Sequence, residues 1–289
     1  MAFTGTQINP KRFGKSQIKF YIILIPLAII FLLPVVYIIS QAFKPLDELF
    51  YFPPKILVEK PTTKNFVDLL RAAGRTGVPM SRYLFNSIIV TVLSIVLTLF
   101  ITVATAYCLS KKDFKAKKTL NSINQLALMF VGTAVGIPRY LVIVHLGLSD
   151  SFLAHIIPYL AMPVGLFLVK QFMDQVPNEL IEAAKVDGAT DFHILLHIII
   201  PQVKPALATV AILVFQQVWN ATEASTTYII DETKKSFAFY LNTLTSSTTG
   251  PAGQGMSAAA GLIMFLPNVI IFILMQSQVM DTMAHSGIK

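Results

Sequence analysis

The chain has 289 residues, of which 54% are hydrophobic and 13% are charged, and its formal net charge is +8. A soluble domain carries roughly 25% charged residues, so this composition excludes a water-soluble globular protein. The single cysteine, Cys108, excludes a disulfide framework and any multi-cysteine metal site, because neither can be built from one thiol. The basic residues gather between apolar runs, a pattern typical of membrane proteins rather than of nucleic-acid-binding proteins.

Six stretches are long and apolar enough to cross a membrane, which takes about 20 mostly apolar residues in a helix. These predicted spans are residues 20–43, 83–110, 120–146, 152–169, 205–222 and 256–280. Prolines inside several of them favour bent helices around a cavity, as in a transporter. We therefore predict an all-α, polytopic membrane protein with six transmembrane helices, consisting of a tail over 1–19 and one transmembrane domain over 20–289.

The distribution of Lys and Arg predicts which side each connection faces, because cytoplasmic loops carry the excess of both residues. Four basic residues lie in the N-terminal tail and five lie between 111 and 118, whereas the connection between the third and fourth spans has none. Both termini are therefore expected in the cytoplasm. Segment 44–82 falls outside in this topology although it holds seven basic residues, and the rule is weaker for so long a loop.

The segment from Gln175 to Pro201, between the fourth and fifth spans, has readable local signals. Pro177 can open a helix, since its missing N–H has no helical partner at that position anyway. Gly188 is suited to close the helix with a positive φ, and Thr190 can cap the next one. The sequence thus predicts a short cytoplasmic helix, a tight turn at Gly188, and a second helix that returns to the bilayer.

This segment resembles the E-A-A loop of the membrane subunits of bacterial ABC importers. The matching positions are Glu182, Ala183, Ala184, Gly188, Ile198, Ile200 and Pro201. Every spacing of the family pattern is kept, and the one departure is Ile200 where the pattern has Leu. Further motifs are similar to the carbohydrate-uptake branch, namely Asp187 and Ala189 beside Gly188, LGL at 146–148, KPALAT at 204–209, WN at 219–220 and the C-terminal MAHSGIK.

The resemblance implies that residues 177–201 form a coupling loop that fits a cleft on an ATPase subunit. In that reading Glu182 faces basic residues of the ATPase, Ala183 and Ala184 allow close approach, and Gly188 gives the turn. It also implies a bacterial inner membrane location and three kinds of protein partner: a second, similar permease subunit, two ATPase subunits and an extracytoplasmic sugar-binding protein. No nucleic acid is expected, and lipid surrounds the spans.

The chain itself is not expected to hydrolyse ATP or to be an enzyme. A phosphate-binding loop needs G-x-x-x-x-G-K-[ST], and the only G-K-S, at residues 14–16, has Asn9 where the first glycine belongs. ATP and Mg²⁺ are therefore expected on the ATPase subunits, with no cofactor here. His193 and His197 lie four residues apart, but no third metal ligand is evident, so no metal site is predicted.

Polar residues inside predicted spans are candidates for the substrate path, because they are costly in a membrane. Arg139 shares a predicted helix face with Gly136 and Gly132, and the alternative is that it snorkels to water. Gln216, Asn220 and Glu223 form a stripe beside Trp219, a mixture that suits sugars, although such groups can equally join helices. Asn268 in the sixth span is a weaker candidate.

Two finer hypotheses concern the cargo and its delivery. A guanidinium beside a path favours an acidic oligosaccharide, since Arg139 could pair with a carboxylate through two parallel hydrogen bonds. The outer loop over 223–255 ends in an uncharged, small-residue stretch at 246–255. The family resemblance implies that this stretch reaches into the binding protein's sugar site through Thr249, Gly250, Pro251 and Gly253, and the alternative is a plain spacer.

The sequence therefore predicts the membrane subunit of an ATP-driven importer that forms half of the path for a sugar or oligosaccharide. The alternatives are a permease for another solute class and an ion-coupled secondary transporter. A secondary transporter should show inverted repeats and intramembrane acidic residues, and neither is evident. An intramembrane enzyme would need a motif such as H-E-x-x-H or G-x-S-x-G, and both are absent.

Overall fold

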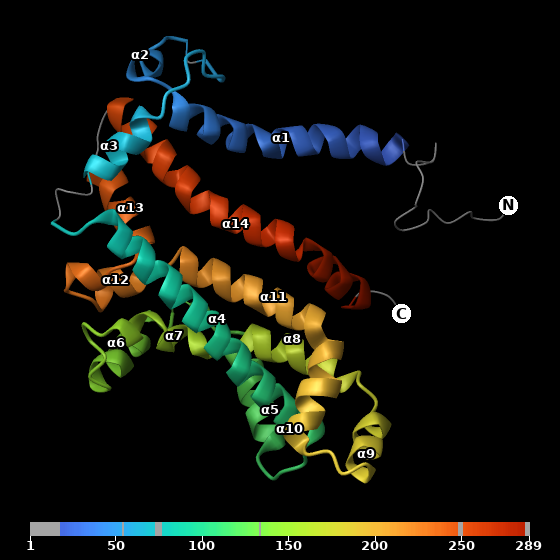
Figure 1. Cartoon of the computed structure of the whole chain (residues 1–289). Helices are drawn as coiled ribbons and strands as arrows, with labels where there is room; N and C mark the ends of the chain where they lie inside the picture. Colours follow the sequence, from blue (N-terminus) through green and yellow to red (C-terminus); the bar gives the residue numbers. More distant parts are fainter. Residues whose placement is uncertain (1–17, 54, 73–76, 133, 248–250, 287–289) are drawn as a thin grey trace. The chain divides into compact units, whose positions relative to one another are not determined.

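The computed structural model describes residues 18–53, 55–72, 77–132, 134–247 and 251–286, and within these ranges it contains helices and no strands (Figure 1). The chain divides into two compact units, residues 1–71 with 245–263 and residues 72–244 with 264–289. The helices are α1 (Ile18–Phe43), α2 (Leu46–Leu49), α3 (Lys64–Ala72), α4 (Met80–Lys111), α5 (Lys117–Ala127), α6 (Gly136–His145), η3 (Phe152–His155), α7 (Ile157–Leu160), α8 (Pro163–Asp174), α9 (Asn178–Val186), α10 (Asp191–Ile194), η4 (Leu195–Ile199), α11 (Ile200–Trp219), α12 (Glu223–Thr227), η5 (Glu232–Lys234), α13 (Phe237–Ser247) and α14 (Pro251–Ser286).

The all-α prediction is confirmed, but the count of six spans is not. Among the described residues, four helical stretches are long and apolar enough to cross a membrane: Ile18–Phe43, Met80–Lys111, Asp191–Thr227 and Gly253–Ser277. A fifth span is formed if the bent pair Phe152–Leu160 and Pro163–Asp174 is counted as one. The fifth predicted span begins earlier than expected, because α10, η4 and α11 continue one into the next.

The third predicted span, 120–146, is two short helices instead of one long helix. α5 ends at Ala127 and α6 begins at Gly136, with turns between them. A continuous helix would have placed Pro138 in its interior, where the ring clashes with the carbonyl of residue 134. As the third residue of α6, Pro138 lacks only an N–H that has no helical partner. Gly132 therefore precedes α6, and the helix face that it was predicted to share with Arg139 does not form.

The fourth predicted span contains a bend of 43° between α7 and α8. Pro163 is the first residue of α8, and the residue before it, Met162, is non-helical with φ −118° and ψ 88°. A proline disfavours the helical conformation in the preceding residue, so the break lies where the sequence requires it. The hydroxyl of Thr98 on α4 donates to the carbonyl of Tyr159 near this bend (3.2 Å).

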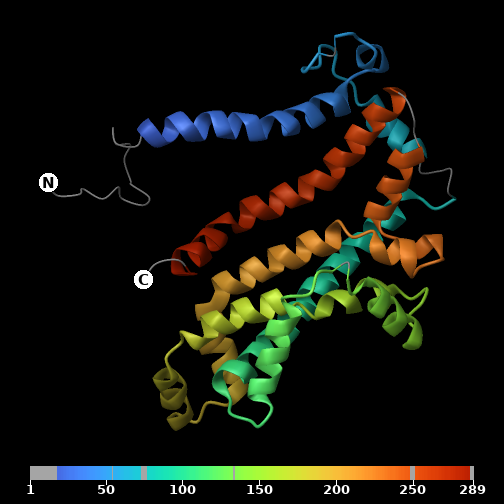
Figure 2. The same cartoon turned by 180° about the vertical axis from the view of Figure 1, so that it is seen from behind.

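The core of the larger unit is built by α4, α8 and α11, which pack against one another (Figures 1 and 2). Buried aliphatic side chains from the three helices meet there, among them Val90, Val103, Val169, Met173, Val203, Val210 and Val214. The face of α4 also buries small polar residues at helical spacing, namely Thr91, Ser94, Thr98 and Thr102. Small polar side chains allow close helix approach within a membrane, so α4 serves as the central packing helix.

In the smaller unit, the segment after α1 is organised by buried polar side chains. Glu48 accepts hydrogen bonds from the backbone N–H groups of Glu59 (3.0 Å) and Lys60 (2.7 Å). Asn65 donates to the carbonyls of Ala42 (2.9 Å) and Lys44 (2.8 Å). These bonds satisfy backbone groups that would otherwise lack partners. The described residues of segment 44–63 are therefore tied to one another and to the end of α1 by hydrogen bonds.

The region predicted as an outer loop over 223–255 is mainly helical in its described part. It contains α12, η5 and α13, and α14 begins at Pro251 instead of near the predicted start at residue 256. The described residues of the stretch 246–255 are helical, since α13 ends at Ser247 and α14 begins at Pro251 with Gly253 buried in it. Proline is well tolerated in a first helical turn, which explains the early start.

Candidate functional site

The predicted coupling loop has the local structure that its sequence indicates. α9 ends at Val186, and Gly188 follows with φ +82°. The Gly188 N–H donates to the carbonyl of Lys185 (3.0 Å) and the Ala189 N–H to that of Ala184 (2.9 Å). This pair of bonds is the Schellman arrangement, which satisfies the last carbonyls of a helix and requires a left-handed residue. A Cβ on Gly188 would meet no atom within 4 Å, so glycine is needed here for its backbone conformation.

The second helix of the loop begins at Thr190, as predicted. The Thr190 hydroxyl oxygen accepts a hydrogen bond from the N–H of His193 (3.3 Å), which is an N-cap bond. α10 then passes into the π-helical turn η4 and on into α11. Hydrogen bonds thus close both turns of the loop.

The residues of the E-A-A pattern divide into an outward set and an inward set. Glu182, Ala183 and Asp187 are exposed, whereas Ala184 and Ala189 are half-buried and pack against the core of the larger unit. An open hollow of about 470 Å³ lies beside them, lined by Ala184, Asp187, Gly188, Ala189, Thr190, His193 and Ile198. The exposed side of α9 and this hollow together offer a surface on which another protein can dock.

Arg139 and Glu223, predicted separately as path residues, form an ion pair. Arg139 Nη1 lies 2.9 Å from Glu223 Oε2, and the two side chains are 28% and 41% exposed. The hydroxyl of Tyr228 donates to the other carboxylate oxygen of Glu223 (2.9 Å). The guanidinium therefore already has a carboxylate partner within the chain.

The predicted path residues Trp219, Asn220 and Asn268 donate hydrogen bonds to backbone carbonyls near them. Asn220 donates to the carbonyl of Gln216 (2.9 Å), so the stripe partly satisfies itself. Trp219 is buried against Phe215 and donates to the carbonyl of Met264 (3.2 Å). Asn268 donates to the same carbonyl (2.9 Å). Trp219 is therefore a packing residue between α11 and α14 and does not present an exposed ring to a sugar.

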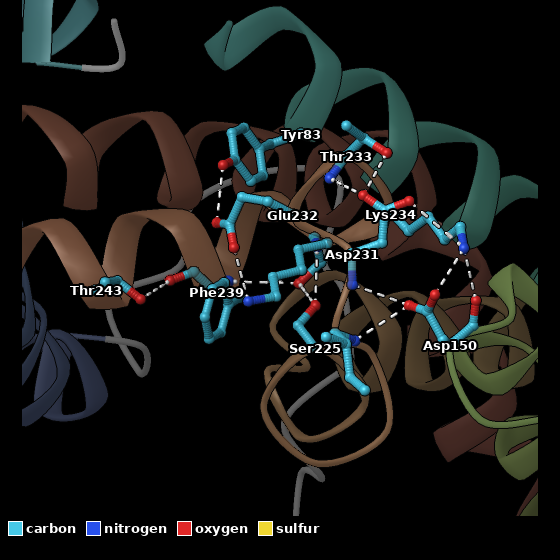
Figure 3. Close-up of polar contacts among 12 residues, drawn as sticks. Tyr83, Asp150, Ser225, Asp231, Glu232, Thr233, Lys234, Phe239 and Thr243 are labelled. Carbon is cyan, nitrogen blue, oxygen red and sulfur yellow. Dashed lines mark hydrogen bonds and ion pairs between the residues drawn. The ribbon is translucent and has the colours of Figure 1, made fainter. Parts of the chain in front are cut away.

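A polar network that was not predicted from the sequence lies at the turn after α6 (Figure 3). Asp150, at φ +56°, accepts hydrogen bonds from the N–H groups of Ile230 (3.1 Å) and Asp231 (2.9 Å) and from the Lys234 ammonium (3.0 Å). The N–H of Asp231 and then the Lys234 ammonium lower the pKa of Asp150, and its carboxylate raises the pKa of Lys234. An Asp between two serines, shortly after Gly147, was the one available signal of this turn.

A second part of this network holds the same segment to α4. Tyr83 donates to Glu232 (2.9 Å), and the Asn86 amide donates to the carbonyls of Thr233 (2.8 Å) and Lys235 (3.0 Å). The segment between α12 and α13 is therefore fixed from two sides.

Of the residues predicted to contact a binding protein, Thr249 and Gly250 lie outside the described residues. Pro251 opens α14, and Gly253 is buried within it. Within the described residues, no group of three or more His, Cys, Asp and Glu side chains is placed to hold a metal ion. His193 and His197 are exposed, and their rings stack at 4.1 Å.

Comparison with known proteins gives one consistent result. The chain is 29% identical over 276 residues to the inner membrane ABC transporter permease protein YcjP of Escherichia coli, covering 95% of this chain and 97% of that one. It is 29% identical over 241 residues to the polygalacturonan/rhamnogalacturonan transport system permease protein YtcP of Bacillus subtilis, covering 83% and 82%.

A solved structure shows the same fold. One chain of a bacterial ABC transporter involved in the import of the acidic polysaccharide alginate matches with a TM-score of 0.78 at 23% identity, covering 93% of this chain and 99% of that one. Residues 3–279 match the model of a single family. The chain therefore belongs to the family of binding-protein-dependent transport system inner membrane components.

Proposed function

We propose that this chain is the membrane subunit of an ATP-driven importer and forms half of the translocation path for a sugar or oligosaccharide. The family is that of inner membrane components of binding-protein-dependent systems, which supports a multi-pass protein in a bacterial inner membrane that receives its cargo from a binding protein. A second permease subunit completes the path, and two separate ATPase subunits supply the energy, since this sequence lacks a phosphate-binding loop. Both termini are cytoplasmic in this proposal.

The structure of the predicted coupling loop is the main support for this proposal. α9 exposes Glu182, Ala183 and Asp187 beside an open hollow, and its far end is closed by Gly188 in the Schellman arrangement. Small residues allow an ATPase surface to come close, and the closed turn resists bending. A rigid, exposed helix of this kind is suited to move with the ATPase and to carry that movement into the spans.

Carbohydrate is the proposed cargo class. The motifs beside the E-A-A pattern resemble the carbohydrate branch, and the Bacillus subtilis relative is named for polygalacturonan and rhamnogalacturonan transport. An acidic oligosaccharide remains the more specific hypothesis. Arg139 is the cation on which this hypothesis rests, and it is paired with Glu223. The carboxylate of an incoming cargo would have to displace Glu223 or share Arg139 with it.

A cross-linking experiment tests the proposed docking surface. A photoreactive amino acid in place of Glu182 should capture the ATPase subunit in membranes that contain the whole complex. The same group in place of Lys118, which is exposed in α5, is the matched control on the same predicted side. Capture from position 118 but not from 182 would contradict the assignment of α9 as the docking helix.

A further inference from the structure

The C-terminal end of α4 contacts the proposed coupling loop at two points, one at the start of α9 and one after its end. Lys111 Nζ donates to the carbonyl of Val176 (2.6 Å) and to Asn178 Oδ1 (3.0 Å), at the start of α9. Lys112 Nζ lies 2.6 Å from Asp191 Oδ1, at the start of α10. We call these two lysines and their partners the α4 clamp.

Two neighbouring contacts strengthen the same arrangement. The hydroxyl of Ser110 donates to Asp174 at the end of α8 (2.6 Å), and the hydroxyl of Tyr107 donates to Asp191 (3.4 Å). α4 ends at Lys111, and Lys112 is extended with φ −112° and ψ 150°. The two lysine side chains can therefore diverge to partners that are separated along the chain by the whole of α9.

The clamp adds a connection that the covalent chain does not provide. The loop is joined by the backbone to α8 on one side and to α10 and α11 on the other, whereas α4 lies far from it in sequence. α4 packs along both α8 and α11, so a displacement of α9 that also moves α4 would move all three core helices together. Without the clamp, α9 would be connected to the core helices through the backbone to α8 and α11 and through packing of side chains such as Ile181 and Ala184.

Because the contact between Lys112 and Asp191 is weak, its effect on coupling can be measured apart from any effect on folding. The side chains of Lys112 and Asp191 are 34% and 54% exposed. The exposed pair of Lys112 and Asp191 contributes only about 0.2–1 kcal/mol, so removing it should leave the fold and the assembled complex intact. The contacts of Lys111 and Lys112 lie at the two ends of α9. A movement of α9 would therefore be passed to α4 at two points.

We propose that Lys111 and Lys112 are positioning residues that tie the coupling loop to α4, so that ATPase-driven movement of α9 is transmitted to the core of the path. This inference rests on the proposed function of α9 as the ATPase-coupling helix. It assigns a role to the end of α4, which the E-A-A pattern does not include.

The test compares two double variants in the complete complex, reconstituted in liposomes with its permease partner, ATPases and binding protein. Lys111→Met with Lys112→Met removes the clamp and keeps side chains of similar length. Lys115→Met with Lys118→Met removes the same charge from exposed positions nearby, which controls for effects on topology. The measured quantity is the number of sugar molecules imported per ATP hydrolysed.

The clamp variant should import at least about threefold fewer sugar molecules per ATP than wild type, because several weak contacts are removed together. The control variant should keep the wild-type ratio. Lys112→Glu alone should also lower the ratio, and adding Asp191→Lys should restore it by reversing the pair. The conservative Lys111→Arg with Lys112→Arg should stay near wild type. A purely structural role would lower the yield of assembled complex without changing the ratio.

Three results would overturn the inference. The ratio of the clamp variant could equal that of wild type, the control could fall by the same factor, or the reversed pair could fail to recover. If the clamp variant does not assemble, the single Lys112→Glu variant and its reversed pair decide the question. Failure of the wild-type complex to import with ATP would overturn the proposed function itself, whereas import with an unchanged ratio would overturn the clamp alone.

Discussion

Gly188 shows how one residue fixes the shape of the proposed coupling loop. Its φ of +82° lies in the left-handed region, where a residue with a Cβ is strained although the surrounding space is open. This position could be predicted from the sequence, because a glycine after a short amphipathic helix has few other uses. The same holds for Thr190 as a cap, since the chemistry of both residues is local.

We predict that Gly188→Val abolishes ATP-driven uptake while the subunit still inserts and assembles. A β-branched side chain in the left-handed region costs about 1–2 kcal/mol or more and distorts the turn. Gly188→Asn is the matched control, because asparagine tolerates this conformation and should keep most activity. Uptake and binding-protein-stimulated ATP hydrolysis are measured together. Normal values in the valine variant would show that the turn is not required.

Arg139 and Glu223 were both identified as candidates from the sequence, but their pairing was not predicted. They lie on α6 and α12, and no local pattern connects residues 84 positions apart. The structure therefore changes the physical argument for an acidic cargo, because the cation is neutralised within the chain.

If the cargo is acidic, Arg139→Gln should lower uptake of an acidic oligosaccharide by about tenfold more than uptake of its reduced, neutral counterpart. The reason is the loss of a charge-assisted hydrogen bond, worth about 1.5–3 kcal/mol. Glu223→Gln removes the competing carboxylate and should preserve or increase uptake of the acidic form. Equal losses for both cargoes in Arg139→Gln would leave the pair with a structural role only.

The Asp150 network gives a pH-dependent prediction. The pKa of Asp150 is lowered by its bonds to the Asp231 N–H and to Lys234, so its stabilising effect is present above the unfolded pKa and is lost as the pH falls through the folded pKa. The pKa of Lys234 is raised, so its effect is present below its unfolded pKa and is lost as the pH rises through the folded value. Asp150→Asn should therefore lower the Tm at pH 7, and its difference from wild type should shrink in acid. A constant difference down to the acid limit would contradict this account.

At the scale of elements, the sequence predicts helices well where composition is uniform and poorly where a span is interrupted. The break before α6, which holds Pro138 in its first turn, and the break at Pro163 follow known proline constraints, yet the long apolar runs favour continuous spans. The early start of α14 also differs from the prediction, because the small residues near Pro251 favour a flexible loop. Pro251 suits a first helical turn, but the burial of Gly253 and Gly255 in this stretch depends on tertiary packing.

Gly255 illustrates such packing at the start of α14. A Cβ at this position would lie 2.7 Å from the side-chain oxygen of Asn65. The Asn65 side chain is buried and cannot move away easily, because its NH2 group donates to the carbonyls of Ala42 and Lys44. Gly255→Ala should therefore lower the free energy of unfolding by about 1–3 kcal/mol, as overpacking does. No sequence signal distinguishes this glycine from its neighbours.

Gly261 in the same helix provides the matched control, because a Cβ there would meet nothing within 4 Å. Gly261→Ala should be neutral or stabilising by up to about 1 kcal/mol, as alanine favours helices. Thermal unfolding of both variants in detergent measures the difference. A Tm that falls equally for both substitutions would contradict the close contact between Gly255 and Asn65.

For the whole molecule, the family and the all-α class could be predicted from composition and one spaced motif, whereas the number of spans could not. The E-A-A pattern depends on residue types at fixed local spacing, so it indicates the family even at low overall identity. The substrate path depends on contacts between distant helices and with a second subunit, and neither is encoded in a short pattern. The finer predictions about cargo therefore depend on experiment.

Uptake by the complete complex in liposomes tests the central claim most directly. Labelled oligosaccharide is supplied outside together with the binding protein, and ATP is supplied on the side of the coupling loops, without any ion gradient. The account predicts accumulation that requires both ATP and the binding protein and that is lost in Gly188→Val. Accumulation driven by an imposed ion gradient without ATP would contradict it and would indicate an ion-coupled transporter.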